Sequence, residues 1–138
     1  MIAMVTIRRA TTEDSLDVRR LLDAAMLEPG DVEASVERGD VLIAVSEGPS
    51  PDDDGETRLH GALVLHPRAD GAHVTAIAVR RRRRDRGIGT ALVEAALERE
   101  SRLTATFDSR VQPFYESLGW DIERIGDDRF CGVTVASE

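Results

Sequence analysis

The pattern of apolar and polar positions along the 138-residue chain predicts alternating strands and helices. Short apolar, β-branched runs between turn-forming residues indicate strands, and apolar residues three and four positions apart indicate helices. The order is strand, two helices, three strands, helix, strand, helix and two strands, which is a mixed α/β domain. The predicted strands cover residues 5–10, 41–45, 59–66, 72–79, 103–107, 120–125 and 129–135. The predicted helices cover residues 13–26, 32–38, 90–99 and 109–118.

Turn and cap residues set the expected limits of these elements. Thr11 or Thr12 is suited to cap the first helix, and Asp31 the second, which Gly39 then ends. Asp108 or Ser109 is the expected cap of the last helix, and Gly119 follows its end. Residues 46–57 are polar and rich in turn formers, which predicts an exposed loop, and residues 67–71 predict a turn. No repeat or linker divides the chain, so we expect a single domain over residues 1–138.

The most informative stretch is a basic, glycine-containing turn between the strand at 72–79 and the helix at 90–99. Five arginines at 80–84 precede Gly87 and Gly89. The first N–H groups of a helix have no partner within the helix, and the helix dipole adds partial positive charge there. Glycines without side chains leave that backbone accessible. The turn is therefore an anion site suited to a phosphate group.

The spacing Arg84-x-x-Gly87-x-Gly89 is neither a P-loop nor a dinucleotide fingerprint. It resembles the acyl-CoA-binding signature of the GNAT acetyltransferases, written Q/R-x-x-G-x-G/A. The predicted order of elements also matches that family from end to end. The resemblance implies a GNAT fold: a mixed, mostly antiparallel sheet of six to seven strands with four helices, in which the parallel fourth and fifth strands splay apart.

In GNAT proteins the acyl-CoA arm enters the gap between the splayed strands, and the loop amides hold the pyrophosphate. Carried over to this chain, the resemblance implies that acetyl-CoA is the co-substrate. The acyl-CoA-binding residues that it implies are Ile77, Ala78, Val79, Arg81, Arg84, Asp85, Arg86, Gly87, Ile88, Gly89, Thr90 and Asp108. The family often has Asn where this chain has Asp108. No metal is expected.

A second match lies in residues 113–120, Pro-Phe-Tyr-Glu-Ser-Leu-Gly-Trp, which resemble the family segment F-Y-E-K-L-G-F. The tyrosine of that segment often donates a hydrogen bond to the CoA sulfur as general acid, and Tyr115 occupies its place. A phenol is a neutral donor near pH 7. The alternative is a core aromatic, but a Tyr buried for bulk alone would leave its hydroxyl without a partner.

His73 is the candidate general base that would deprotonate the acceptor amine. It lies six residues before Val79, where a branch of the resembling family has Glu, and imidazole titrates in the useful range. A surface histidine at a sheet edge is the competing interpretation. Asp70, Glu33, Glu28 and bound water are the other candidates for the base.

Composition narrows the class of protein. The chain has 26 Asp+Glu, 18 Lys+Arg and a net charge of -8, whereas nucleic-acid binding favours a broad basic surface. All the basic residues are Arg, and with the acidic excess this suggests adaptation to high salt. No apolar run is long enough to span a membrane, and residues 1–5 do not resemble a signal peptide. The single cysteine, Cys131, fits a cytoplasmic protein.

These observations predict an N-acetyltransferase that moves an acetyl group from acetyl-CoA to a primary amine by direct attack. Residues 27–39, residues 67–72 and the C-terminal hairpin are expected to choose the amine, through the carboxylates of Glu28, Asp31, Glu33, Glu37 and Asp70. The family resemblance favours a homodimer. The alternatives are a non-catalytic acyl-CoA-binding domain and a nucleic-acid-binding module that uses Arg80–Arg86.

Overall fold

The computed structural model describes residues 5–24, 31–46, 59–80 and 87–136. The strands are β1 Val5–Arg9, β2 Val41–Ser46, β3 Leu59–Arg68, β4 Gly71–Val79, β5 Arg102–Phe107, β6 Asp121–Gly126 and β7 Arg129–Val135. The helices are α1 Ser15–Ala24, α2 Val32–Arg38, α3 Ile88–Glu100 and α4 Gln112–Ser117, and a short 3₁₀ helix at Thr12–Asp14 precedes α1.

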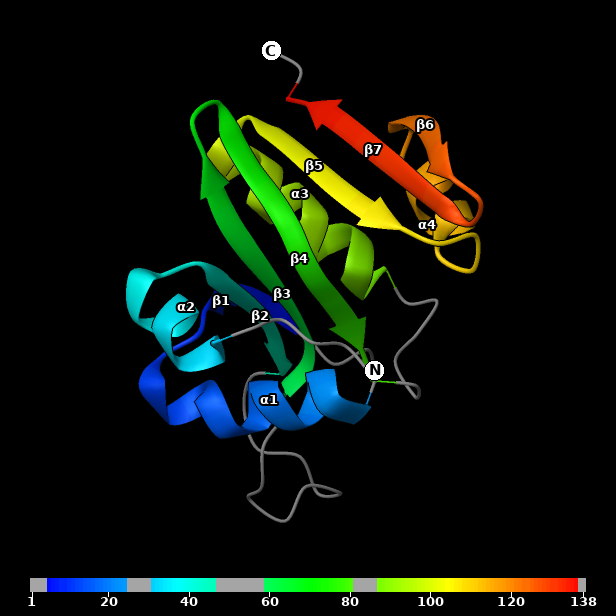
Figure 1. Cartoon of the computed structure of the whole chain (residues 1–138). Coiled ribbons are helices and arrows are strands. Elements are labelled where there is room, and N and C mark those ends of the chain that lie inside the picture. The colour runs from blue at the N-terminus through cyan, green and yellow to red at the C-terminus, as the bar shows by residue number, and fades with distance from the viewer. Residues whose placement is uncertain (1–4, 25–30, 47–58, 81–86, 137–138) are drawn as a thin grey trace.

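The strands form one seven-stranded sheet in the order β1-β2-β3-β4-β5-β7-β6. Among these pairs β4 and β5 are parallel, and the others are antiparallel. Figure 1 shows α1 and α2 on one side of the sheet and α3 on the other. The predicted mixed α/β fold, with its order of elements and its parallel fourth and fifth strands, is confirmed.

The sheet separates two apolar cores. One core lies between the sheet and α3 and contains Leu63, Leu92, Leu103 and the aromatic residues of the C-terminal part. The other core lies under α1 and α2 and contains Val18, Leu22, Val36 and Ile43, among others. The helices bury their apolar stripes on opposite faces of the sheet, as amphipathic helices do in layered α/β domains.

A β-bulge in β4 shifts by one position the alternation of residues that face α3 and residues that face α1 and α2. Val64 pairs with Ala76 and Leu65 pairs with Val74, so Thr75 is the extra residue on β4. Before the bulge, Ala72 and Val74 belong to the α3 core. After it, Ala76 and Ala78 belong to the core under α1 and α2, while Ile77 and Val79 pack against the α3 core. A bulge bends its strand and increases the local twist.

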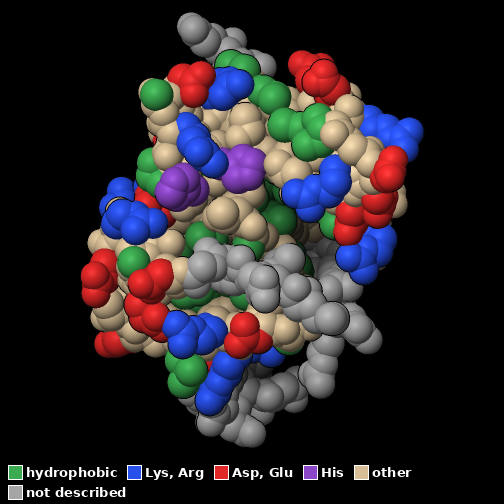
Figure 2. Space-filling model, in the orientation of Figure 1, with side chains coloured by type: hydrophobic (Ala, Val, Ile, Leu, Met, Phe, Trp, Pro, Cys, Tyr) green, Lys and Arg blue, Asp and Glu red, His purple; other side chains and the backbone are tan. Residues whose placement is uncertain are grey.

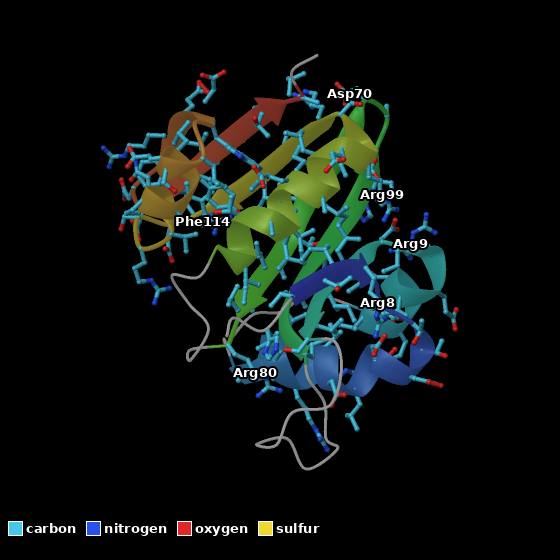
Figure 3. The ribbon with its side chains drawn as sticks, turned by 180° about the vertical axis from the view of Figure 1, so that it is seen from behind. Arg8, Arg9, Asp70, Arg80, Arg99 and Phe114 are labelled. Atoms are coloured by element: carbon cyan, nitrogen blue, oxygen red, sulfur yellow. The ribbon has the colours of Figure 1, made fainter. Side chains whose placement is uncertain are left out.

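A buried carboxylate ties the end of α3 to the beginning of β2. The side chain of Asp40 is 5% exposed; its Oδ2 accepts from Arg38 Nε and its Oδ1 from Arg99 Nη2, each at 3.0 Å. Arg99 also donates to the carbonyl of Gly39. Figure 3 shows Arg99 at the far end of α3, reaching toward this corner. The ion pairs therefore fix the tilt of α3 across the sheet.

Some predicted limits of elements are wrong. Residues 67 and 68 belong to β3 rather than to a turn, because the hairpin pairing continues to Arg68 opposite Gly71. Neither Asp108 nor Ser109 caps α4; its N-cap is Val111, without a side-chain hydrogen bond. The caps proposed at Asp31 and Gly39 are confirmed. The expected loop at 46–57 and the end of the first helix at 25–26 lie largely or wholly outside the described residues.

Candidate active site

The parallel strands β4 and β5 separate after a short paired segment. The paired residues of β4 are Ala72, His73 and Val74, and the pairing ends where Val74 lies opposite Ala105. Within the described residues, no strand pairing joins β4 to β5 beyond Val74. The bulge at Thr75 lies at the point of separation, because its extra residue turns β4 away from β5. We call this opening the fork.

The backbone of β4 beyond the bulge presents hydrogen-bonding groups to the fork. The Arg80 N–H donates to His60 O at 2.8 Å, so Arg80 is directed toward β3. Successive residues of a strand direct their N–H and C=O groups to alternate edges. Ile77 and Val79 therefore direct theirs toward the side where β5 has diverged. This direction is the one that the predicted contacts with acyl-CoA require. Ala78 instead turns its backbone toward β3 and its side chain into the core under α1 and α2.

The start of α3 is built to leave amides accessible. Gly87, the N-cap, has φ 77° in the left-handed region, and a Cβ there would meet nothing within 4 Å. The helix has neither a side-chain cap nor an acidic residue in its first turn. The Ile88 side chain is buried, so that residue can offer only its backbone N–H; Gly89 and Thr90 follow in the same turn. Unpaired amides at a helix start suit an anion.

Gly89 has a packing role that the sequence did not indicate. A Cβ at this position would lie 3.1 Å from Cε1 and 3.2 Å from Cζ of Phe114. Figure 3 shows Phe114 beside the start of α3. The missing side chain therefore lets α4 approach α3, and α4 carries Tyr115 in the next position.

Tyr115 is held by three aromatic rings and has a buried hydroxyl. Its ring centroid lies 4.4 Å from that of Phe107, 4.7 Å from Trp120 and 5.1 Å from Phe114. The residue is 2% exposed, and no hydrogen-bond partner of its hydroxyl occurs in the described part of the chain. Burial raises its pKa, so the phenol stays protonated. Phe107 ends β5, so the stacking places Tyr115 beside one arm of the fork.

His73 lies on β4 immediately before the fork. Ala72 and Val74 face α3, so the His73 side chain occupies the opposite side, which we call the open face. Its Nδ1 lies 2.7 Å from Thr104 Oγ1 on β5. Burial first, and then the positive charges of Arg68 and His66, lower its pKa, which favours the neutral imidazole. A neutral ring held at one nitrogen can accept a proton at the other.

Asp108 is engaged by its neighbour. Its Oδ2 accepts from Arg110 Nη2 at 2.8 Å and from Nε at 3.2 Å, and its Oδ1 accepts from the Arg110 N–H at 2.9 Å. The hydrogen bonds from Arg110 hold the pKa of the carboxyl below its usual range. The negative charge of Asp108 is thus paired inside the turn, which reduces its repulsion of a nearby polyanion.

Four predicted binding residues, Arg81, Arg84, Asp85 and Arg86, lie outside the described residues. Sequence reasoning missed the bulge at Thr75, the aromatic clamp around Tyr115 and the Thr104 partner of His73. The bulge and the Thr104 contact depend on strand register. The aromatic spacing of Phe107, Phe114 and Trp120 was visible and could have suggested the clamp.

The sequence from residue 37 to residue 122 matches the family model described as an acetyltransferase (GNAT) domain. This match spans more than half of the chain, and the chain therefore belongs to the GNAT acetyltransferase family. No curated protein sequence matches the chain.

Solved structures share the fold at low identity. Ard1 from Thermoplasma volcanium superposes with a TM-score of 0.76 at 18% identity, covering 99% of this chain and 100% of that one. N-acetylglutamate synthase from Neisseria gonorrhoeae, complexed with coenzyme A and L-arginine, superposes with a TM-score of 0.75 at 18% identity. The match covers 99% of this chain and 34% of the synthase. Diaminobutyrate acetyltransferase EctA from Paenibacillus lautus, in complex with L-2,4-diaminobutyric acid and coenzyme A, superposes with a TM-score of 0.69 at 16% identity. The match covers 97% of this chain and 96% of EctA. The chain spans about a third of the synthase.

The described residues contain no group of three or more His, Cys, Asp or Glu side chains placed to hold a metal ion. No helix among them is long and apolar enough to cross a membrane.

Proposed function

We propose that the chain is an N-acetyltransferase that transfers the acetyl group of acetyl-CoA to a primary amine by direct attack. The observation that carries this proposal is the fork between β4 and β5 beside the buried hydroxyl of Tyr115, which has no hydrogen-bond partner among the described residues. The residues present fit the co-substrate. The edge of β4 at Ile77 offers strand-like hydrogen bonds, and the start of α3, which has no side-chain cap, offers amides for a diphosphate. Acetyl-CoA supplies the activated acyl group and a thiol leaving group.

His73 is the proposed base for the acceptor. For this role Nδ1–H donates to Thr104 Oγ1, and Nε2 keeps the lone pair that takes a proton from the acceptor's ammonium group, after which the neutral amine attacks the thioester. The lowered pKa keeps the imidazole neutral to a lower pH than usual, at the expense of basicity. The backbone N–H of Ile77 is a candidate to stabilise a developing oxyanion.

Tyr115 is the proposed donor to the departing sulfur. A thiol of the cysteine kind has a pKa of about 8.5, which lies below that of a phenol. Burial raises the Tyr115 pKa further, so complete proton transfer to a thiolate is uphill. The hydroxyl therefore acts by donating a hydrogen bond as negative charge develops on sulfur, and bulk solvent supplies the proton later.

The related structures support the choice of reaction. Those of N-acetylglutamate synthase and EctA contain coenzyme A, and EctA holds an amine as its substrate. The competing proposal is a domain that binds acyl-CoA without turnover. A third, binding of nucleic acid through Arg80–Arg86, rests on residues of which only Arg80 is described, and Arg80 Nε donates to Leu59 O at 2.5 Å.

The test is a panel of primary amines incubated with acetyl-CoA, with release of the free thiol as the readout. We expect turnover with at least one amine, and a large loss of kcat in Tyr115→Phe and His73→Gln. Acetyl-CoA binding without turnover on any amine would favour the non-catalytic domain. Tight binding of DNA, and none of acetyl-CoA, at the same ionic strength would refute the proposal altogether.

A further inference from the structure

The open face of the sheet around His73 carries positive charge. His66 on β3 pairs directly with His73 on β4, which in turn pairs with Thr104 on β5. Arg68 lies two residues beyond His66, on the same face of β3. Figure 2 shows histidine side chains gathered with arginine side chains on this face. An acceptor whose amine reaches His73 from this side would therefore pass over a cationic surface.

Arg68 is available to a ligand, unlike the other cation nearby. It is exposed and forms no ion pair with any residue that the structure describes. Arg102, which is also on this face, pairs with Asp70 at 3.5 Å. The chain has a net charge of -8, whereas this patch, with an arginine that has no ion-pair partner among the described residues and two histidines beside it, is locally positive.

Of the five carboxylates expected to attract a cationic amine, three are engaged elsewhere, Glu37 is exposed on α2, and Glu28 lies outside the described residues. Asp31 accepts from the Ala34 N–H as the cap of α2, at 3.0 Å. Glu33 pairs with Arg19, and Asp70 pairs with Arg102. After burial itself, the charges of Arg68 and His66 lower the pKa of His73, and no carboxylate among the described residues raises it. The electrostatic field at the proposed base is therefore positive.

We infer that the acceptor amine also bears a carboxylate, as an amino acid does, and that Arg68 binds this carboxylate while the amine lies at His73. The inference rests on the proposed function and names its substrate class. A guanidinium presents two parallel donors to a carboxylate, and such charge-assisted pairs are among the stronger hydrogen bonds. Directly opposed residues of an antiparallel pair have Cβ atoms about 5 Å apart, so His66 lies alongside the bound molecule.

The kinetic test compares amino acids with their own carboxamides, which keep the amine and lose the negative charge. We expect the wild type to prefer the acids by about tenfold or more in kcat/KM. In Arg68→Gln this preference should disappear through a higher KM for the acids, whereas kcat/KM for the carboxamides should change much less. Arg20→Gln is the matched control, because Arg20 is exposed on α1 away from the buried stripe. It should keep the preference.

Several results would overturn the inference. They are a wild type that prefers the carboxamides, an acid preference that survives in Arg68→Gln, and a preference for O-phosphoethanolamine over every amino acid, which would replace the carboxylate by a phosphate. Turnover of no amine at all would instead refute the proposed function, and a binding experiment then decides the inference separately. In that experiment, amino acids should shift the imidazole NMR signals of His66 and His73 in the wild type but not in Arg68→Gln. Unshifted signals in the wild type would overturn it.

Discussion

Replacing Tyr115 by Phe separates the role of the hydroxyl from the role of the ring. The ring stacks on Phe107 at 4.4 Å and contacts Trp120 and Phe114, and Phe preserves these contacts. The hydroxyl is buried without a partner among the described residues, a state that costs about 1–3 kcal/mol relative to water. Removing it relieves that cost and forfeits no hydrogen bond.

We therefore expect Tyr115→Phe to unfold with a free energy equal to that of the wild type or up to about 1 kcal/mol higher. Loss of a donor to a developing charge lowers a rate by about 10²-fold or more, which corresponds to about 2.7 kcal/mol in the barrier. The variant should thus combine undiminished stability with a kcat reduced about 10²-fold. Urea unfolding and thiol release under saturating acetyl-CoA measure the two quantities.

A companion variant, Trp120→Phe, removes bulk from the same aromatic cluster and leaves the hydroxyl in place. We expect it to lose about 1–3 kcal/mol of stability and to keep most of its kcat while folded. A Tyr115→Phe protein that is destabilised by more than about 1 kcal/mol would mean that the hydroxyl has a partner in the protein. Unchanged kcat would remove Tyr115 from the mechanism.

Four other expectations follow from contacts and charges described above. Gly89→Ala places a Cβ 3.1 Å from the ring of Phe114, so we expect a loss of about 1 kcal/mol in urea unfolding, and the added change Phe114→Leu should restore part of it. Asp40→Asn breaks a carboxylate held by Arg99 and a second arginine, and should cost about 2 kcal/mol, because the arginines remain partly exposed; wild-type stability in this variant would mean that the ion pairs contribute nothing. Burial lowers the pKa of His73 from 6.5, so the unfolded chain binds that proton more readily and stability falls as the pH drops below about 6.5. His73→Gln should lose less stability than the wild type between about pH 7.5 and pH 5.5, and an identical pH profile would contradict this. Finally, with 26 Asp+Glu against 18 Lys+Arg, stability and kcat should both rise from dilute buffer to molar KCl, and no change would exclude salt adaptation.

The elements of this fold were predictable because their apolar periodicities differ clearly. The run at 41–45 is continuously apolar and forms a buried strand, whereas Leu92, Val93 and Ala96 recur at helical spacing and face the sheet. Errors arose where pairing overrides local preference. Pro67 and Arg68 suggest a turn by residue type, yet the hairpin extends through both because β4 continues opposite them.

The candidate site was predictable only in part. Gly87 was recognised from its place between a strand and a helix, and its positive φ follows from that place. The packing role of Gly89 could not be inferred, because Phe114 lies 25 positions later and meets it only after α4 folds back. Asp108 was expected to cap a helix, but a closer donor, Arg110, occupies its carboxylate. Arg68 was overlooked because an exposed charge in an assumed turn has no distinguishing pattern.

The single additional residue at Thr75 changes which residues of β4 face each side of the sheet within one continuous strand. Because of this residue, Ala72 and Val74 face α3 in the first half of β4, whereas Ala76 and Ala78 face α1 and α2 in the second half. Deleting Thr75 would restore regular alternation opposite β3 and would leave Ala76 and Ala78 facing α1 and Ile77 and Val79 facing α3, as they do now. A shortened β4 of this kind could stay beside β5 for its whole length, so one deletion would close the opening without moving any side chain to the other face of the sheet.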